Sequence, residues 1–425
     1  MAGQEQLSRA GDITINDVTI ITSDGYVQTI VPQVAGIDIY EDIFGTFITG
    51  KVYLKDSQDI QNLLPLVGEE TLRISLKTPT FDDMHSYDME FFIYRMDDKF
   101  QIAERQIACC LHFISKEAII DVNRRISKGY SGKVSEIVKT ILQDDMFGFG
   151  TKKPLNIEDT QNDTKYVSNF WTPLQNIQLL CEAAVNQTNS PSYIFFENKH
   201  GLNFISLETM YYGTPLYQRF IKSNYSAEMS PGGGSRRDIL KDYQTILDIE
   251  MSEQFDFFKR LKSGMFGSEL ITYDILSKQY THVGYRPNWT EEKHLNEYPM
   301  WTKDLPARMK ACMINVPKYY NNFENYDDVT NAKIIQKRKS LIARAEGYKV
   351  QITVHGRTDY TAGQKVYLEV PKTAQITPED TDTRNKIVSG NYIIAACLHS
   401  ITQKTHQCVL ELVKDSYMVN INDPK

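Results

Sequence analysis

The sequence predicts an α+β protein that is predominantly β, in which two similar antiparallel β-barrels accompany a small α/β domain and an insertion. A glycine turn followed by an alternating strand and a hairpin occurs near the beginning of the chain and again near its end. The first copy covers Leu66–Ile114 and the second covers Tyr360–Val413. Between them, apolar residues recur at helical spacing. Two unrelated blocks are the alternative explanation, because short antiparallel strands resemble one another.

The first barrel is predicted over residues 1–117. Its strands alternate with a period of two, as expected when one face packs on a core and the other faces solvent. The segment Asp12–Ile21 opens the series with recurring β-branched residues. The inward side chains of the next strands are Val52, Leu54, Leu72, Ile74 and Leu76. Asp56–Leu64 predicts a short helical turn over the barrel mouth, begun by an Asp or Ser cap.

The small α/β domain is predicted over residues 118–212. One helix has a single apolar stripe, formed by Val134, Ile137, Val138, Ile141 and Leu142. The next helix has clear start signals, because Thr172 and Gln175 form a capping box around Pro173 at the first helical position. Its buried stripe is predicted to be Leu174, Ile177, Leu180, Cys181 and Ala184. A hairpin follows, with arms at Tyr193–Glu197 and Leu202–Leu207.

The second barrel is predicted over residues 213–280 and 336–418, with an insertion of unknown fold at residues 281–335. Its first strands are Leu247–Met251 and Glu269–Asp274, after an exposed loop at Pro231–Arg237. A helix then precedes Gly347, which stands at a suitable position to end it. We expect Ile334, Ile335, Leu341, Ile342 and Ala345 on its buried face and Lys333, Lys337, Arg338 and Lys339 in solvent. The later strands present Val350, Ile352 and Val354, and then Val366, Leu368 and Val370, to the core.

The composition argues against several classes of protein. The 425 residues include 47 Lys and Arg and 54 Asp and Glu, a formal net charge of −7. A surface that coats nucleic acid needs clustered basic residues, so this class is disfavoured. The 25 tyrosines and 19 phenylalanines fit large protein contacts, although tyrosine is also common in strands. The six cysteines form no CxxC pair and predict buried free thiols in a reducing compartment. The chain has no apolar run long enough to cross a membrane and no signal region at its start, so we expect a soluble protein made in a cytoplasm.

No catalytic, cofactor-binding or metal-binding motif stands out. His399 and His406 lie on the two arms of the last hairpin and could approach each other, but they are predicted as strand or core residues rather than metal ligands. The glycines of Pro231–Arg237 lack the lysine of a phosphate-binding P-loop. The run Lys333–Lys339 could contact nucleic acid, but a solvated helix face is favoured.

Segments Gly36–Val52, Leu54–Ile60 and Gly68–Leu72 look like the first barrel of a known family, the baseplate central hub proteins of T-even-type contractile phage tails. Trp171–Ile177 and Tyr193–Leu207 resemble the α/β domain that follows it, and Gly347–Val413 is similar to the closing barrel. The resemblance lies in ordered blocks over most of the chain, and the segment Thr281–Asn331 matches none of them.

The resemblance implies a structural role in a virion, at the tail baseplate, with no cofactor. Such hubs form a homotrimeric ring with two barrels per subunit, which presents six near-equivalent units around an axis. The ring adapts the three-fold cell-puncturing spike to the six-fold tail tube. Further implied partners are tube-initiator or tape-measure proteins and baseplate wedge proteins, while DNA passes through the channel without specific binding. Related hubs in type VI secretion are fused to their spike; this chain ends soon after the second barrel, so we expect a separate spike protein.

Subunit contacts are expected at the loops Asp38–Phe47 and Asp56–Ile60, because loops carry partner contacts more often than strands do. Ordinary barrel turns are the alternative interpretation. The residues predicted at the interface are Asp38, Tyr40, Glu41, Asp42, Phe44, Asp56, Ser57, Asp59, Tyr360 and Tyr392.

Two other functions remain open from the sequence. A cell-wall hydrolase of the tail could use carboxylates of the α/β domain such as Glu158, Asp159 and Glu182. A β-rich carbohydrate-binding or adhesion module could use the aromatic segment Thr281–Asn331 as its binding site.

Overall fold

The computed structural model describes residues 9–57, 60, 66–79, 86–104, 106–213, 219–222, 239–253, 255–274, 278–301, 312–317, 328–373, 383–403 and 405–421. Its largest element is a 13-stranded sheet, mostly antiparallel, so the predominantly β fold predicted from the sequence is confirmed. The strands of its first half are β1 (Thr14–Ile21), β2 (Val27–Thr29), β3 (Val34–Asp42), β4 (Thr49–Asp56), β5 (Thr71–Lys77), β6 (Tyr87–Ala103) and β7 (Gln106–Ser115), with the 3-10 helix η1 (Val31–Gln33) before β3.

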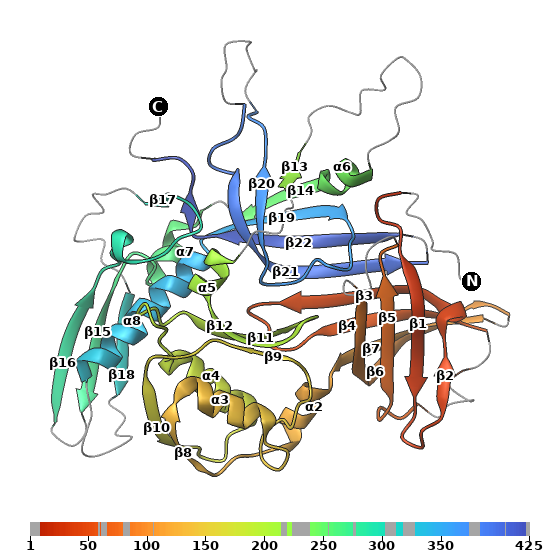
Figure 1. Cartoon of the computed structure of the whole chain (residues 1–425), viewed down its shortest axis with the longest axis horizontal. Coiled ribbons are helices and arrows are strands. Elements are labelled where there is room, and N and C mark those ends of the chain that lie inside the picture. Colours follow the sequence, from red (N-terminus) through yellow and green to blue (C-terminus); the bar gives the residue numbers. More distant parts are fainter. Residues whose placement is uncertain are drawn as a thin grey trace.

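The second half of the sheet comes mainly from the C-terminal part of the chain. Its strands are β13 (Arg219–Ile221), β14 (Ile246–Glu253), β19 (Tyr348–His355), β20 (Lys365–Glu369), β21 (Gly390–Thr402) and β22 (His406–Lys414), with α6 (Ile239–Gln244) before β14 and α7 (Phe257–Lys262) after it. The halves join where β3 pairs with β21, from Gly36 opposite Thr402 to Asp42 opposite Ala396. Figure 1 shows β14, β19, β22, β21, β3 and β4 stacked across this junction.

Each half encloses its own hydrophobic cluster, because alternate side chains of every strand point to one face. The cluster of the first half includes Val52, Leu54, Leu72, Ile74 and Leu76, as the alternation predicts. The cluster of the second half includes Val350, Ile352, Val354, Val366, Leu368 and Val370, again as predicted. The residues in both sets are at most 5% exposed, so the inward faces of these strands were predicted correctly.

An α/β unit (residues 116–212) lies below the sheet in Figure 1. Its elements are α2 (Lys116–Asn123), β8 (Gly129–Lys133), α3 (Val134–Gln143), β9 (Leu155–Ile157), β10 (Asp163–Val167), α4 (Pro173–Ala183), β11 (Tyr193–Asn198), β12 (Gly201–Ser206) and α5 (Leu207–Tyr212). The predicted stripe of α3 is buried and the hairpin is β11–β12. The capping box of α4 is present in both directions, but Asn176 is buried on this helix while Leu174 is only half-buried.

A third group of elements packs beside the α/β unit. Strands β15 (Ser268–Asp274), β16 (Gln279–Tyr285) and β18 (Cys312–Pro317) form a separate three-stranded sheet, and α8 (Asp328–Ala345) contacts it. We expected β15 in the second barrel, but it pairs with β16 and β18. The remaining elements are η3 (Trp289–Glu291) and the small pair β17 (Tyr298–Pro299) and β23 (Ser416–Tyr417).

The burial of α8 differs from the prediction. Its most buried side chains are polar, at i, i+4 spacing: Gln336 donates to the carbonyls of Ser268 and Val283, and Ser340 donates to that of Met265. The face expected in solvent is half-buried, since Arg338 donates to carbonyls of the α/β unit. The prediction was wrong because α8 lies between two structured neighbours, so both of its sides meet backbone carbonyls.

Several predictions lie outside the described residues: the loop Pro231–Arg237, the side chain of Lys333, and most of the helical turn Asp56–Leu64, including Asp59. The side chains of five of the six cysteines are described, and all five are free thiols, four of them buried. No helix in the described part of the chain is long and apolar enough to span a membrane.

Candidate subunit interface

The two halves of the sheet repeat the same strand order. In the first half, neighbouring strands run β5-β6-β7-β4-β3, and in the second they run β20-β21-β22-β19-β14. Every neighbouring pair in both series is antiparallel. A glycine with positive φ precedes each opening strand, Gly68 at 94° and Gly363 at 90°. The two blocks therefore share a topology, as the sequence repeat suggested.

Irregularities in strand pairing recur at matching places. The register of β6 with β7 shifts between Ile93 and Arg95, and that of β21 with β22 shifts between Ile394 and Ala396. Likewise β3 shifts against β4 just after Val34, and β14 shifts against β19 just after Ile246. Bulges of this kind are specific structural features, so their coincidence supports a duplicated unit.

Because the unit is duplicated, the two strands that pair at the β3–β21 junction each have a counterpart elsewhere in the sheet, and in the described part of the chain these two counterparts do not pair with each other. By position, β14 corresponds to β3 and β6 corresponds to β21. Among the described strands, β14 pairs only with β19, and β6 pairs with β5 only up to Phe92. Within the described residues, the outer edge of β14 and the corresponding edge of the far part of β6 therefore have no neighbouring strand, and such edges are templates for pairing with another chain.

Apolar side chains are exposed beside both of these edges. On β6, Tyr94, Phe100 and Ile102 are 46–60% exposed. Leu247 lies on β14, and Phe255 and Phe258 follow that strand with about three quarters of their surface exposed. Exposed apolar groups next to an open strand edge are typical of an interaction surface.

The structure places three of the predicted interface residues inside the chain. Glu41, Tyr360 and Tyr392 are each 0–1% exposed. Tyr392 donates to the carbonyl of Val388, and Tyr360 packs edge-on against Phe220. These side chains make their contacts within the chain.

Glu41 connects three parts of the chain. Its carboxylate accepts from Tyr87 of the first half at 3.3 Å and from the backbone N–H of Lys199 in the α/β unit at 3.1 Å. From the second half it accepts from the Ala362 N–H at 3.0 Å and from the Thr361 hydroxyl. A buried carboxylate needs hydrogen bonds of this kind, because a buried carboxylate without partners strongly destabilises the fold.

The other predicted interface residues vary in exposure. Tyr40, Asp42, Phe44 and Ser57 are exposed and Asp38 is half-buried. Asp56 is buried and accepts from the N–H of Ile60 at 2.8 Å, as expected of a helix cap. Tyr40 and Asp42 lie on β3 and Phe44 lies in the turn after it, while Ser57 follows β4. Their contact with another subunit stays a prediction.

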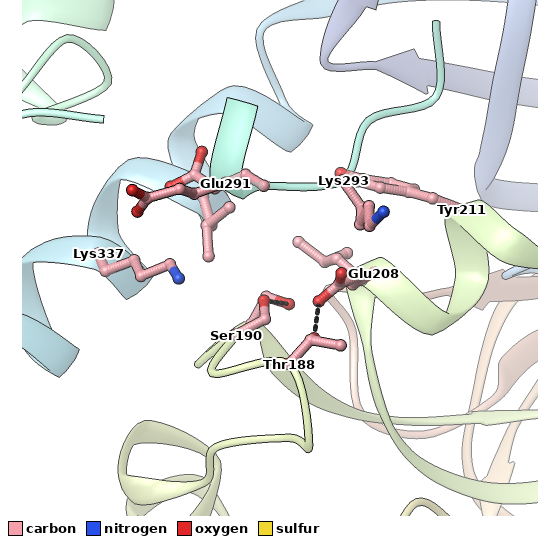
Figure 2. Close-up of a pocket in the computed structure, with 11 residues that line it drawn as sticks. Thr188, Ser190, Glu208, Tyr211, Glu291, Lys293 and Lys337 are labelled. Atoms are coloured by element: carbon pink, nitrogen blue, oxygen red, sulfur yellow. Dashed lines mark hydrogen bonds between the residues drawn. The ribbon is translucent and has the colours of Figure 1, made fainter. Parts of the chain in front are cut away.

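A small pocket lies between the α/β unit and α8. Figure 2 shows Thr188, Ser190 and Glu208 on one side and Lys337 on the other. Its volume is about 10 Å³, room for about one water molecule, and Thr188 already donates to Glu208 at 2.6 Å. Larger open hollows of about 470 and 610 Å³ lie beside Pro191 and beside Lys153. In the second of these hollows, Lys153 Nζ forms ion pairs with Glu117 Oε2 at 2.6 Å and with Glu197 Oε1 at 2.5 Å.

Of the carboxylates considered for a hydrolase, one has a structural role and the other two are exposed. Glu158 accepts from the Ser206 N–H at 2.7 Å and from its hydroxyl at 3.1 Å, which fixes the start of α5. Asp159 and Glu182 are exposed.

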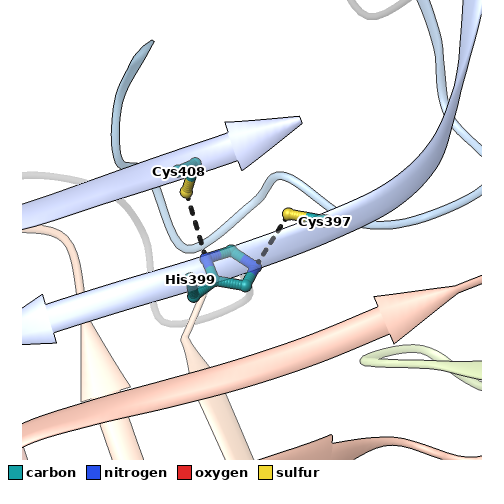
Figure 3. A group of neighbouring side chains, drawn as sticks. All are labelled: Cys397, His399 and Cys408. Atoms are coloured by element: carbon teal, nitrogen blue, oxygen red, sulfur yellow. Dashed lines mark hydrogen bonds between the residues drawn. The ribbon is translucent and has the colours of Figure 1, made fainter. Parts of the chain in front are cut away.

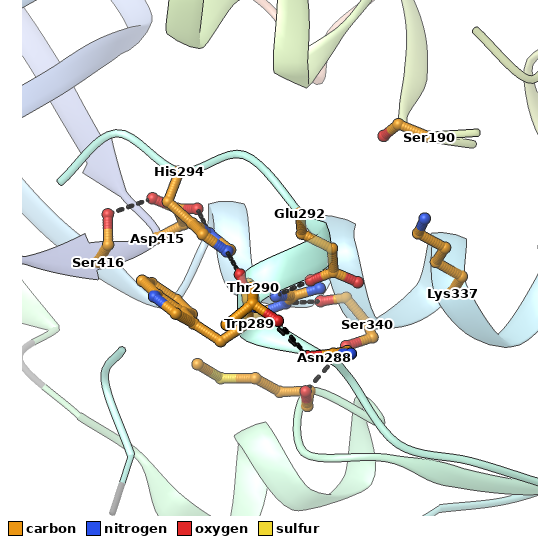
Figure 4. A network of polar contacts seen from close by, with 12 residues as sticks. Ser190, Asn288, Trp289, Thr290, Glu292, His294, Lys337, Ser340, Asp415 and Ser416 are labelled. Atoms are coloured by element: carbon orange, nitrogen blue, oxygen red, sulfur yellow. Dashed lines mark hydrogen bonds and ion pairs between the residues drawn. The ribbon is translucent and has the colours of Figure 1, made fainter. Parts of the chain in front are cut away.

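In the described part of the aromatic segment considered for glycan binding, Trp289 and His294 make contacts within the chain. The Trp289 ring stacks on His294 with centroids 3.5 Å apart, and His294 Nδ1 lies 2.7 Å from Asp415 Oδ2 of the second half. Figure 4 shows this network beside the contacts of Glu292, which pairs with Arg344 of α8 at 2.5 Å. These contacts attach the segment to the second half and cover one face of the half-buried Trp289 ring.

Comparison with solved structures shows which fold this is. The chain superposes on a tail protein from Neisseria meningitidis MC58 with a TM-score of 0.57 and 11% identity, covering 94% of this chain and 96% of that one. It superposes on the 43 kDa tail protein of prophage MuSo2 from Shewanella oneidensis with a TM-score of 0.54 and 9% identity, covering 94% and 98%. No protein-family model matches the sequence, and no curated protein does. The chain shares the fold of these tail proteins, in agreement with the resemblance to tail hub proteins in its sequence.

Proposed function

We propose that this chain is the structural hub of a contractile phage tail, a homotrimeric ring that adapts a three-fold cell-puncturing spike to the six-fold tail tube. The observation that carries the proposal is the matched pair of open edges on β14 and β6. Because the two edges differ, contacts between them are head-to-tail, and such contacts form a ring when the rotation between neighbours closes, as one third of a turn does for a trimer. A trimer of duplicated subunits then presents six similar units.

The internal junction specifies how neighbouring subunits would pair. Within the chain, Ile37 lies opposite Ile401 and Asp38 opposite Ser400. Counting from the matching bulges, Ile249 and Glu250 of β14 take the places of Ile37 and Asp38. The same count puts Phe100 and Lys99 in the places of Ile401 and Ser400, to within about one residue because of the additional β6 bulges.

This register gives complementary pairs across the proposed subunit contact. Ile249 would meet Phe100, an apolar pair, and Glu250 would meet Lys99, a pair of opposite charge. Cross-strand pairs of both kinds are favourable by about 0.2–1 kcal/mol each. The ring would also cover Phe255 and Phe258 beside β14 and Tyr94 and Ile102 on β6, which are exposed in the single chain.

The remaining parts of the proposal follow from the tail fold and the charge. The spike, tube-initiator or tape-measure proteins and baseplate wedge proteins are the proposed partners, and the virion tail is the proposed location. A net charge of −7 suits a channel that lets DNA pass, because an acidic wall repels phosphate. The role is structural rather than enzymatic.

The first test is the mass of the purified chain by light scattering over a dilution series. We expect a trimer. Phe100→Asp should raise the dissociation constant at least about tenfold, because it places an unpaired charge among apolar groups. Phe147→Asp is the matched control, since Phe147 is also exposed but belongs to the α/β unit.

Charge reversal tests the register itself. Lys99→Glu and Glu250→Lys should each weaken the trimer, and the two together should restore it. A chain that stays monomeric at every concentration, both alone and with a candidate spike protein, would overturn the hub proposal. A trimer that tolerates Phe100→Asp would retain the hub and reject the β14–β6 contact.

A further inference from the structure

Four metal-binding side chains meet where β21 pairs with β22. His399 and Cys408 lie opposite each other in the register, with Cys397 and His406 each two residues away on the same strand face. Cys408 Sγ lies 3.2 Å from His399 Nδ1 and 3.4 Å from His406 Nε2, and the two nitrogens are 3.0 Å apart. Figure 3 shows Cys397 on the other side of the His399 ring.

These separations fit one metal ion. Zn–S and Zn–N bonds of about 2.3 and 2.0 Å in a tetrahedron put neighbouring ligand atoms roughly 3.3–3.7 Å apart. The triangle of Cys408 Sγ, His399 Nδ1 and His406 Nε2 is within a few tenths of an ångström of that spacing. Cys397 Sγ lies 3.4 Å from the other ring nitrogen of His399, Nε2, and within 4.8 Å of Cys408 Sγ, so its side chain would have to rotate to become the fourth ligand.

The surroundings of His399 also suit a ligand. Its second ring nitrogen, Nε2, lies 3.1 Å from the carbonyl oxygen of Tyr360. A histidine that binds metal through one nitrogen usually donates its other N–H to such a carbonyl, which fixes the ring. All four side chains are 0–1% exposed, so the site is closed, as structural zinc sites are.

We propose that Cys397, His399, His406 and Cys408 bind a structural zinc ion. We expected no metal site from the sequence, because no Cys/His spacing typical of a metal site appears and His399 and His406 are predicted as strand or core residues. The site would lie at the junction of the two halves: Cys397 belongs to the core of the second half, while Ile401, further along β21, belongs to that of the first. The His399 ring also meets that of Tyr87 on β6, with centroids 5.8 Å apart.

Zinc binding would change the protonation of the cluster. Both thiols must lose their protons and both imidazoles must be neutral, so binding releases protons to solvent. Burial alone would raise the pKa of Cys408, but Cys397 and the two histidines hold it well below its usual range. The competing arrangement is a metal-free pair of the Cys408 thiolate with a protonated His399, whose pKa the Cys408 charge raises against the effect of burial.

The experiment measures metal in the full-length chain purified without added metal or chelator. We expect about one zinc per chain by elemental mass spectrometry, and a large loss of zinc in Cys408→Ser. Cys181→Ser is the matched control, because Cys181 is also a buried thiol but lies in α4 of the α/β unit. This control should retain its zinc.

A second measurement needs no variant, in case Cys408→Ser does not fold. Replacing the metal of the wild-type chain with Co²⁺ should give the absorption of tetrahedral cobalt with thiolate charge-transfer bands. A chain that purifies without zinc, binds no Co²⁺ and melts at the same temperature with zinc or with a chelator would overturn the proposal and favour the thiolate–imidazolium pair. The proposal does not depend on the trimer, since all four ligands come from one chain.

Discussion

At the scale of single residues, buried charged groups hold the parts of this chain together. Glu41 accepts four hydrogen bonds from three parts of the fold. Lys414 is its basic counterpart: burial lowers the pKa of its side-chain amine, whose nitrogen donates to the carbonyls of Val388 and Ser389 and lies 4.7–5.3 Å from the ring centroids of three tyrosines. Such groups are stable only when every partner is in place, so each marks a junction that must form correctly.

Replacing Glu41 should destabilise the chain. In Glu41→Gln the amide NH₂ cannot accept the bonds that one carboxylate oxygen accepted, so a buried donor is left unpaired. We expect a loss of about 2 kcal/mol in the free energy of unfolding, measured with denaturant. Glu69→Gln is the control, since Glu69 is exposed, and it should change stability little. Equal effects of the two substitutions would contradict the role given to Glu41.

The environment of Asp415 predicts that the free energy of unfolding falls at acidic pH. Burial would raise the pKa of its carboxyl, but hydrogen bonds from His294, Ser416 and the Leu295 N–H outweigh burial and hold the pKa below its usual value. A lowered pKa stabilises the folded chain above the unfolded value of about 3.9, and this contribution is lost as the pH falls through the folded pKa.

The comparison of wild type with Asp415→Asn measures this contribution. We expect a difference of about 1–3 kcal/mol in unfolding free energy near neutral pH, which shrinks below about pH 4. Denaturant unfolding at a series of pH values gives the difference. If it stays constant down to the acid limit of the native state, the lowered pKa is not the cause.

At the scale of elements, local sequence signals predict where a helix begins, whereas the elements packed against a helix decide which of its faces is buried. Helix α4 begins where its capping box predicted, at Thr172 and Pro173. The faces of α8 were predicted wrongly, because its polar side chains pair with carbonyls on both sides rather than with water. Periodicity assigns the apolar stripe of a helix, but it contains no information about a polar partner from a distant part of the chain.

The capping box of α4 should contribute measurably to stability. Thr172→Ala removes the acceptor for the Gln175 N–H, now 3.1 Å away, and should cost about 1 kcal/mol. Thr140→Ala is a matched control within α3, where Thr140 is exposed and alanine has the higher helix propensity. Thermal unfolding followed by circular dichroism should show a lower midpoint for the first variant only.

At the scale of the whole molecule, the β3–β21 pairing makes one sheet from two similar halves. Seven residue pairs, from Gly36–Thr402 to Asp42–Ala396, connect strands more than 350 positions apart in the chain. The same arrangement, repeated between subunits, is what we propose for the ring. Internal and external contacts would then share one geometry, which explains the use of a duplicated subunit.

The shared sheet predicts that both halves open together. Hydrogen exchange in increasing denaturant should release the amides of β4 and β22 at the same midpoint, because loss of either half exposes β3 or β21. Amides of α3, in the α/β unit with its own core, provide a comparison. Separate midpoints for β4 and β22 would show that the junction does not couple the halves.

The sequence by itself determined the β-rich class, the repeat of strand and hairpin, the inward faces of the strands and the caps of the helices. These depend on local spacing, which a single segment contains. Only the tertiary structure decided that Glu41 lies at a junction, that β15 leaves the second barrel, that α8 is enclosed, and that Cys397, His399, His406 and Cys408 meet. Each of these depends on which distant segments become neighbours, and strand pairing over hundreds of residues leaves no periodic trace in the sequence.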